Sequence, residues 1–218
     1  MILINKNNLI SLIQNTKAFH QPKVKLEQYC IDAISAVDLI YYAGFEFNDI
    51  NNSIIVDLGS GTGRLSISSA YFNPKYILSV DIDNSALYIL RENILTLDLQ
   101  HLIFPICSDI KYFELSKRIL PNNIKLTTIM NPPFGVQRKS ADRGFLKKAF
   151  SFSDVVYSIH LGKKSIRDFI VNYVIKFGWK VDNILPFSLN LERSFPFHSK
   201  KTKKIEVNVY RFIKKSVN

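Results

Sequence analysis

Two short motifs in this chain combine residue types that could carry out methyl transfer to a nitrogen. The first is Asp57-Leu58-Gly59-Ser60-Gly61-Thr62-Gly63, a glycine-rich turn that follows the apolar run 54–56 and precedes a helical pattern. The second is Asn131-Pro132-Pro133-Phe134, which ends the apolar run 127–130. The first is typical of a cofactor loop, and the second of a clamp for a planar amine. Together they predict methyl transfer from S-adenosylmethionine to a nitrogen.

The glycine-rich loop is suited to a ligand that approaches the backbone closely. Gly59, Gly61 and Gly63 allow a tight turn and place no Cβ in the way of a ligand. Their spacing is Gly-x-Gly-x-Gly, whereas loops that bind a dinucleotide pyrophosphate have Gly-x-Gly-x-x-Gly. Asp57, at the start of the loop, would repel a phosphate but accept a cationic sulfonium and amino group. A nicotinamide cofactor and a turn without a binding function are the alternatives.

Two further acids follow later apolar runs and extend the predicted donor site. Asp81 comes roughly 20 residues after the glycines, where an acid that binds ribose hydroxyls is usually found. Asp109 follows the next run and could bind an adenine amine. The loop and these acids therefore predict one site for the whole donor.

The use of the Asn-Pro-Pro-Phe motif follows from the weak nucleophilicity of a conjugated amine, whose lone pair is delocalised into the ring. The side-chain oxygen of Asn131 and the carbonyl of Pro132 can each accept one N–H and draw the nitrogen toward tetrahedral geometry. The prolines stiffen the backbone and hold both acceptors in place before the target arrives. Phe134 offers a face on which a base could stack, which contributes about 1–3 kcal/mol. The predicted catalytic residues are Asn131, Pro132, Pro133 and Phe134.

The charge of the chain favours a polyanionic partner. Its net charge is +11, and lysines and arginines placed near phosphates release counterions. A base stacked in a helix cannot reach the clamp, so a flipped or unpaired nucleotide is implied. Two basic segments, 138–148 and 198–204, are predicted to flank the active site, and a solvated charged surface is the alternative for each. The predicted RNA-binding residues are Arg138, Lys139, Phe197, His198, Lys200, Lys201 and Lys203.

Short β-branched runs alternate with helical patterns, which predicts the sheet that positions both motifs. The predicted strands are 53–58, 76–81, 102–106, 126–131, 154–159, 180–187 and 205–213. Helices are expected around 9–13, 31–43, 63–72, 84–96, 142–152 and 163–177. This alternation predicts parallel strands with right-handed crossovers and helices on both faces. No helix separates the last two strands, so they should form an antiparallel pair at one end.

The predicted fold is therefore α/β, a Rossmann-like class I S-adenosylmethionine-dependent methyltransferase with a seven-stranded, mostly parallel sheet and an antiparallel last strand. Residues 1–29 are expected to form an N-terminal helix and an arm beside the substrate and cofactor, and 30–218 a single methyltransferase domain. Two cysteines without metal-ligand spacing predict neither a disulfide framework nor a metal site. The chain lacks an apolar run long enough for a membrane span and a recognisable targeting signal, so a cytoplasmic location is expected.

Six segments in a fixed order resemble a known family, the ribosomal RNA adenine methyltransferases typified by methyltransferase-like protein five and its archaeal relatives. The likeness runs from about Phe19 to Phe212 and rests on 26–29, 57–63, 81–83, 131–135, 157–160 and 205–212. The resemblance implies methylation of the 6-amino group of an adenine in small-subunit ribosomal RNA. With the loop argument, it gives a predicted donor site of Gln28, Tyr29, Asp57, Gly59, Gly61, Thr62, Arg64, Asp81, Ile82, Asp109 and Ile110.

The resemblance also implies a small zinc-containing activator protein that docks on an edge of the sheet. In the usual strand order of this fold the third strand is an edge, and here it reads Leu102-Ile103-Phe104-Pro105-Ile106. This sequence is unusually apolar for an exposed edge, which favours a covering partner.

Three other functions remain open at this point. A protein methyltransferase acting on a glutamine amide uses a similar clamp, but such enzymes usually carry Tyr at the position of Phe134. DNA adenine methylation is less favoured because the chain has no separate target-recognition domain. An RNA-binding scaffold without catalysis is the third alternative, and the intact Asn131 and glycines argue against it.

Overall fold

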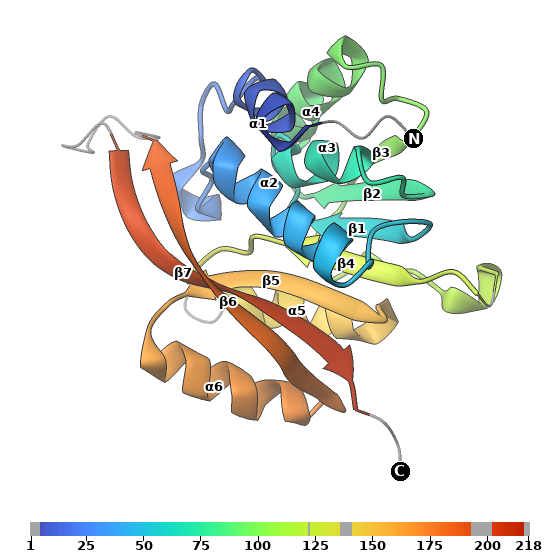
Figure 1. The fold of residues 1–218 in the computed structure, drawn as a ribbon, viewed down its shortest axis with the longest axis vertical. Coiled ribbons are helices and arrows are strands. Elements are labelled where there is room, and N and C mark those ends of the chain that lie inside the picture. The colour runs from blue at the N-terminus through green and yellow to red at the C-terminus, as the bar shows by residue number, and fades with distance from the viewer. Residues whose placement is uncertain (1–4, 122, 136–140, 193–201, 216–218) are drawn as a thin grey trace.

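A single sheet runs through the centre of the molecule, and its strand ends position the predicted motifs (Figure 1). The computed structural model describes residues 5–121, 123–135, 141–192 and 202–215. The strands are β1 (Ile54–Leu58), β2 (Tyr76–Asp81), β3 (Ile103–Cys107), β4 (Leu126–Met130), β5 (Val155–Leu161), β6 (Trp179–Glu192) and β7 (Thr202–Lys214). Their order in the sheet is β3-β2-β1-β4-β5-β7-β6.

The pairing of the strands is parallel except at β7. From β3 across to β5 all neighbours are parallel, and β7 lies antiparallel between β5 and β6. This confirms the predicted mostly parallel sheet of seven strands, with an antiparallel last strand and a terminal pair at one end. It also confirms that β3 forms the opposite edge of the sheet.

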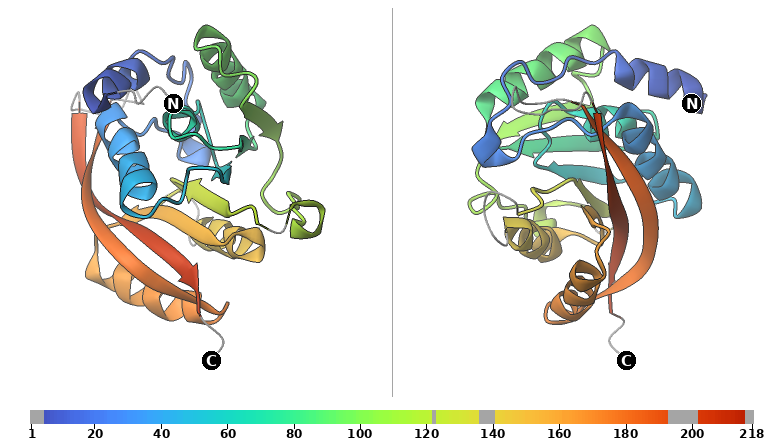
Figure 2. Two further views of the ribbon diagram at one scale, coloured as in Figure 1. Left: turned by 45° about the vertical axis from the view of Figure 1, so that its right-hand side comes forward. Right: turned by 90° about the vertical axis from the view of Figure 1, so that its left-hand side faces the viewer.

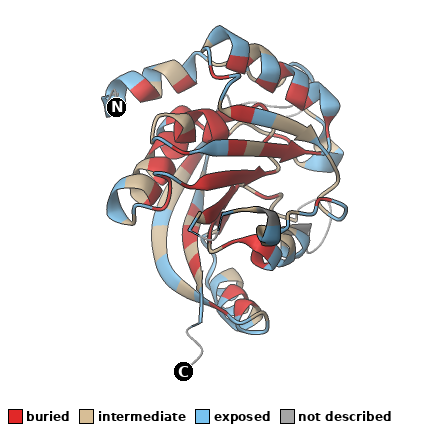
Figure 3. Cartoon of the chain, turned by 90° about the vertical axis from the view of Figure 1, so that its right-hand side faces the viewer, coloured by how far each residue is buried: buried red, intermediate tan, exposed pale blue. Residues whose placement is uncertain are grey.

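Helices cover both faces of the sheet. The helical elements are α1 (Lys6–Gln14), η1 (Val24–Leu26), α2 (Ala33–Tyr41), η2 (Tyr42–Glu46), α3 (Arg64–Ala70), α4 (Asn84–Thr96), η3 (Lys117–Ile119), α5 (Ala141–Phe152) and α6 (Lys164–Ile175). Residues of α1 to α4 share one hydrophobic cluster, and residues of α5 and α6 share the other. The central strands between the clusters are almost wholly buried (Figure 3). No helix among the described residues is long and apolar enough to cross a membrane.

Several elements differ in extent from the sequence prediction, among them α2, β6 and β7. The second helix begins at Ala33 because the side chain of Asp32 accepts hydrogen bonds from the backbone N–H and the hydroxyl of Ser35 (3.0 and 2.8 Å) and caps the helix. The last two strands are longer than predicted because β6 and β7 continue to pair with each other beyond the end of β5. The paired strands curve together along one side of the sheet (Figure 2).

The N-terminal helix packs into the same core as the sheet. Leu9 and Ile13 of α1 are fully buried in the cluster that contains Ile55 of β1 and Ile129 of β4. The chain then passes through Phe19 and η1 to reach the carboxyl ends of the strands. A domain boundary after residue 29 stays a prediction, and the residues before it contribute both to the core and to the site described below.

Asp49 links strands β5 and β7 to Lys125, the residue that precedes β4, away from the predicted site. Its side chain is 1% exposed and accepts hydrogen bonds from Tyr157 Oη (2.6 Å), Arg211 Nε (2.9 Å) and Lys125 Nζ (2.9 Å). Replacing Asp49 with alanine should lower the free energy of unfolding by about 3–5 kcal/mol, because it leaves buried partners without an acceptor. Chemical denaturation would measure this loss. Asp168→Ala, on an exposed part of α6, is the control and should stay within about 0.5 kcal/mol of the parent.

Candidate active site

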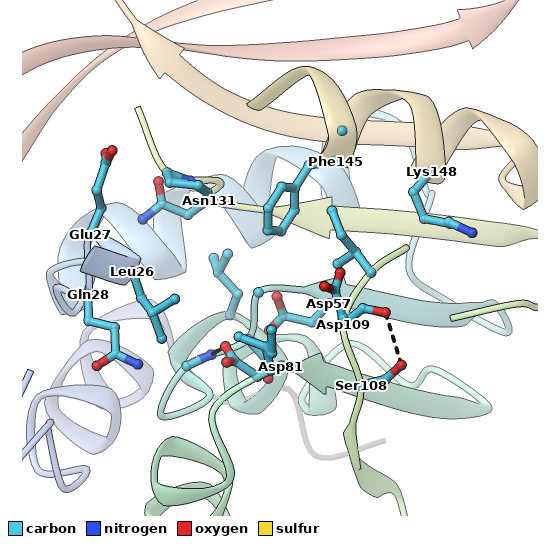
Figure 4. A pocket seen from close by; sticks show the side chains of 18 of the residues that line it. Leu26, Glu27, Gln28, Asp57, Asp81, Ser108, Asp109, Asn131, Phe145 and Lys148 are labelled. Atoms are coloured by element: carbon cyan, nitrogen blue, oxygen red, sulfur yellow. Dashed lines mark hydrogen bonds between the residues drawn. The ribbon is translucent and has the colours of Figure 1, made fainter. Parts of the chain in front are cut away.

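A cavity of about 750 Å³ opens at the carboxyl ends of the parallel strands. Its walls come from the loop after β1, the segments after β2, β3 and β4, helix α5 and the N-terminal arm. Figure 4 shows the side chains of Asp57, Asp81 and Asn131 gathered around this cavity. Every residue predicted to bind the donor lines it, namely Gln28, Tyr29, Asp57, Gly59, Gly61, Thr62, Arg64, Asp81, Ile82, Asp109 and Ile110. Their individual roles remain predictions.

The glycine-rich loop needs glycine for two separate reasons. Gly61 has a φ of +54°, a left-handed conformation that a side chain disfavours, and its N–H donates to Asp81 Oδ2 at 2.8 Å. Gly63 has a φ of +92°, and a Cβ there would lie 2.1 Å from Leu90 Cδ1. The loop therefore turns tightly and packs against α4 while its backbone is tied to the acid that ends β2.

Asp57 presents one unused carboxylate oxygen at this cavity. Its side chain is 1% exposed, and Oδ2 accepts hydrogen bonds from the backbone N–H and the hydroxyl of Ser66 (3.1 and 2.6 Å). Oδ1 is buried and has no hydrogen-bond partner within the described part of the chain. Burial, with a smaller contribution from the nearby Asp81 carboxylate, raises the pKa of Asp57 to about 7. A cationic group would satisfy this oxygen and favour its ionised form.

Two hydrogen-bonding groups from the same loop and helix complement Asp57. Ser60 Oγ and Arg64 Nε are buried and, among the described residues, have no hydrogen-bond partner. Arg64 is held in place by its Nη1, which donates to the carbonyl of Ile31 at 2.7 Å. An unpaired acceptor beside unpaired donors fits the ammonium and carboxylate of an amino acid. The methionine end of S-adenosylmethionine is such a group, so these residues fit the predicted donor.

The acid that ends β2 is suited to hydroxyl groups. Asp81 Oδ1 accepts the N–H of Asp83 (2.8 Å) and Oδ2 accepts the N–H of Gly61, which leaves lone pairs on both oxygens for further donors. Burial raises the pKa of Asp81. Farther along the cavity, the Asp109 carboxylate accepts the N–H of Lys111 (2.9 Å), and the apolar side chains of Ile110 and of Phe145 in α5 both line the wall. A planar ring would fit between such apolar side chains.

The Asn-Pro-Pro-Phe motif follows β4 and reaches the same cavity. Asn131 and Pro133 line the cavity, Pro132 is buried, and Phe134 is half-buried against the core cluster. Tyr29 Oη donates to Asn131 Oδ1 at 3.2 Å, and its ring lies 5.6 Å from that of Phe134, tilted by 38°. The clamp and the unpaired oxygen of Asp57 thus face one space, as transfer between two bound molecules requires.

Some residues of the cavity had no role in the sequence prediction. Phe19 and Ser60 line it, Phe145 approaches Gly59 from α5, and Asp83 binds the arm from just outside. Asp83 belongs to the Asp-Ile-Asp segment that follows β2, so its position was the available signal. Phe145 lies within the basic segment 138–148, which was predicted to flank the site for its charge alone, and no local pattern marks Phe19. Within the described residues, no group of His, Cys, Asp or Glu side chains could hold a metal ion.

Most of the predicted RNA contacts lie outside the described residues. This holds for Arg138, Lys139, Phe197, His198, Lys200 and Lys201. Lys203 belongs to β7, but its side chain is also outside that description. Within the described part of segment 138–148, Lys147 and Lys148 of α5 line the cavity, and Lys148 pairs with Glu114 at 2.7 Å. The RNA-binding role of these segments stays a prediction.

Comparison with known proteins identifies the family. A family profile described as the TRM5/TYW2 methyltransferase domain matches residues 46–134. The zebrafish (Danio rerio) rRNA N(6)-adenosine-methyltransferase METTL5 is 34% identical over 213 residues, which cover 94% of this chain and 96% of the relative. The chain belongs to the METTL5 family. The resemblance predicted from the sequence is therefore confirmed, and the protein is a methyltransferase of the S-adenosylmethionine-dependent class.

Other relatives extend this METTL5 assignment. The Drosophila melanogaster rRNA N(6)-adenosine-methyltransferase is 28% identical over 97% of this chain and 98% of its own length. The crystal structure of a proposed RNA methyltransferase from Pyrococcus horikoshii superimposes with a TM-score of 0.87 at 36% identity, covering 99% of this chain and 100% of that one. The structure of TYW2 from Methanocaldococcus jannaschii in complex with AdoMet (S-adenosylmethionine) superimposes with a TM-score of 0.55 at 20% identity and covers 83% of this chain and 74% of that one, which supports the fold. The predicted class I methyltransferase fold is confirmed.

Proposed function

We propose that this protein transfers the methyl group of S-adenosylmethionine to the 6-amino group of an adenine in small-subunit ribosomal RNA. The observation that carries the proposal is the shared cavity, which has the unpaired Asp57 oxygen on one wall and the Asn131 acceptor on another. Family membership supports the adenine and the ribosomal RNA, since relatives across nearly their full length are named for that reaction.

The residues around the glycine-rich loop would hold the donor. Asp57 would accept the ammonium group, and Ser60 and Arg64 would bind the carboxylate. Asp81 would accept the ribose hydroxyls, while Asp109 and Ile110 would contact the adenine. When bound, S-adenosylmethionine supplies a methyl group attached to a cationic sulfur. Gln28, Gly59, Gly61, Thr62 and Ile82 complete the surface that encloses it.

The clamp residues would prepare the target amine for attack. Asn131 Oδ1 and the Pro132 carbonyl would each accept one N–H, which holds the nitrogen in line and favours a localised lone pair. Pro133 stiffens this turn, and Phe134 packs beside it. Once methylated, the nitrogen carries a positive charge and loses a proton readily to water. No strong general base is needed at this site.

The main alternative, methylation of a glutamine amide in a protein, is less well supported because the METTL5 relatives are named for ribosomal RNA. An activator protein on the β3 edge stays a proposal. Tyr76 and Phe104 are 51% and 40% exposed there and form an edge-to-face pair with ring centroids 5.8 Å apart, which supports a covering partner. A cytoplasmic location likewise stays a prediction.

The proposed function can be tested with labelled S-adenosylmethionine and small-subunit ribosomal RNA that lacks the modification. Nucleosides from the product would be identified by mass spectrometry. We expect N6-methyladenosine at one position, with or without an activator protein in the mixture. Absence of label from RNA in both mixtures, with label entering a protein glutamine, would overturn the proposal in favour of the alternative.

We expect the Lys200→Ala/Lys201→Ala variant to bind RNA more weakly and with a smaller dependence on salt. Each phosphate contact that is lost should reduce the slope of log K against log salt by about 0.7–0.9. Binding measured between 50 and 300 mM salt would give this slope. Lys176→Ala/Lys180→Ala, exposed at the end of the β6–β7 pair that lies away from Thr202, has the same charge change and should keep the parent slope. An unchanged slope in the first variant would place the RNA elsewhere.

A further inference from the structure

The N-terminal arm, residues 23–29, connects the donor side of the cavity to the target clamp. At its start, Lys23 Nζ donates to Asp83 Oδ1 at 2.6 Å. Gln28 Nε2 donates to the other carboxylate oxygen of Asp83 at 2.7 Å, and Gln28 Oε1 accepts the backbone N–H of Lys23 at 2.8 Å. Both polar ends of the Gln28 side chain are thus engaged by the protein. Asp83 fixes the arm at two points.

Tyr29 follows Gln28 directly in the chain, and its side chain turns toward the clamp. Its hydroxyl donates a hydrogen bond to Asn131 Oδ1, and its ring lies against the ring of Phe134. Glu27, which lies between η1 and Gln28, adopts a left-handed conformation (φ 51°, ψ 39°). Such a conformation costs about 1–2 kcal/mol for a residue with a side chain, so the surrounding contacts must hold it. The contacts of the arm with the rest of the protein therefore determine its conformation.

The hydroxyl of Tyr29 has a chemical consequence for Asn131. An asparagine amide has an oxygen on one side and an NH₂ on the other, and only the oxygen can accept an N–H from a target amine. A phenol that donates its proton to Oδ1 favours the orientation with the oxygen at that position. It also leaves the second lone pair of Oδ1 for the target. Burial raises the pKa of Tyr29, so the hydroxyl keeps this proton across the working pH range.

The anchor is also joined to the donor side. The backbone N–H of Asp83 donates to Asp81 Oδ1, the acid proposed to bind the ribose. Asp83 in turn caps α4 by accepting from the backbone N–H of Ser85 at 3.1 Å. Burial raises the pKa of Asp83, but the hydrogen bonds from Lys23, Ser85 and Gln28 outweigh burial and hold this pKa well below the ordinary range, so Asp83 stays ionised and keeps its contacts with the arm. Movement of this acid would displace the arm and Tyr29 with it.

We propose that Tyr29 is a positioning residue of the target clamp and that Asp83 is the anchor of the arm that carries it. This revises the role that the sequence predicted for Tyr29, which was binding of the donor. The inference rests on the proposed function, because it assigns Asn131 Oδ1 the task of accepting an N–H from the amine. A purely structural role for Tyr29 is the competing explanation, and its consequences differ.

The test compares methyl transfer and donor binding in Tyr29→Phe, which keeps the ring and removes only the hydroxyl. In a single turnover at saturating donor and RNA, we expect the transfer rate to fall by about 10-fold, as for a lost hydrogen bond worth about 1.4 kcal/mol in the transition state. The donor Kd and the melting temperature should stay near those of the parent. A structural role would instead lower the melting temperature and leave the rate of the folded enzyme unchanged.

A second variant tests the anchor. Asp83→Asn keeps an acceptor for the helix cap but loses the ion pair with Lys23 and presents an NH₂ to the arm. We expect it to lower the transfer rate by a similar factor. The double variant should lose little more than either single variant, since both changes release the same hydroxyl from Asn131. If the fold-losses in transfer rate of the two single variants multiply in the double variant, Asp83 and Tyr29 act independently, and the role of Asp83 as the anchor of the arm is wrong.

Tyr157→Phe is the matched control, because it removes another tyrosine hydroxyl, which donates to the Asp49 carboxylate away from the residues that line the cavity. It should lower the melting temperature and leave the transfer rate unchanged. If the parent enzyme does not methylate adenine, the proposed function fails. If the parent methylates adenine and Tyr29→Phe matches its rate, the inference fails alone. A donor Kd raised by the full factor of the rate loss would restore Tyr29 to the donor site.

Discussion

Asn131→Ala should lower the rate of methyl transfer by at least about 10²–10³-fold, the loss typical of removing one preorganised hydrogen-bonding group that acts in the transition state. The side chain would accept an N–H from the target amine, and no other described side chain of the cavity occupies that position after β4. The donor groups are on other elements, so the donor Kd should change by less than about twofold. Single-turnover rates and calorimetric titration would measure the two quantities separately.

The control for this variant is Asn172→Ala, on an exposed part of α6, where the side chain only donates to the carbonyl of Asp168. It should match the parent in both measurements. Equal losses of transfer and donor binding in Asn131→Ala would mean that Asn131 belongs to the donor site. A transfer rate within a few-fold of the parent would mean that the Pro132 carbonyl alone can hold the amine.

The sequence predicted the position of the site well because its motifs follow buried strands. Asp57, Asp81 and Asn131 each come directly at or after the end of an apolar run, and parallel strands bring such ends to one edge. Their convergence on one cavity needed only the strand order, which right-handed crossovers largely determine. The position of β3 at the edge was predicted from the usual strand order of this fold.

The contacts of the arm could not be predicted in this way. Lys23 and Gln28 meet Asp83 across 60 and 55 residues of sequence, in a segment with neither helical nor strand periodicity. The side-chain pairing depends on the path of an irregular segment, and only the folded core determines that path. The sequence prediction assigned Tyr29 and its neighbour Gln28 to the same donor site, but Gln28 turns toward Asp83 while Tyr29 turns toward Asn131.

The far end of the β6–β7 pair shows an extension that the prediction missed. The predicted strands were 180–187 and 205–213, whereas β6 continues to Glu192 and β7 begins at Thr202. The added residues pair with each other through the backbone, and Leu189 is fully buried in the core cluster. Apolar and polar residues alternate through 187–192, so the strand pattern was present in the sequence and the predicted strand ended too early.

Donor binding should weaken as the pH falls below about 7, because burial raises the pKa of Asp57 to about 7 in the free enzyme. Above that pH the carboxylate is ionised and attracts the donor ammonium group. Below it the carboxyl is neutral, and binding requires the loss of its proton. If only the ionised form binds, the donor Kd should rise about 10-fold between pH 8 and pH 6. Calorimetry in buffers of different ionisation enthalpy should detect a proton released on binding at pH 6.

Two variants separate Asp57 from the other acid in the cavity. Asp57→Asn keeps the shape and the hydrogen bonds to an acceptor oxygen but cannot ionise, so its donor Kd should be raised at pH 8 and change little down to pH 6. Asp81→Asn should bind the donor more weakly but keep most of the pH dependence, since Asp57 remains. A pH dependence that persists in Asp57→Asn and disappears in Asp81→Asn would assign the titration to Asp81, whose pKa burial also raises. The carboxylate that meets the ammonium group is thus identified by which variant makes donor binding insensitive to pH.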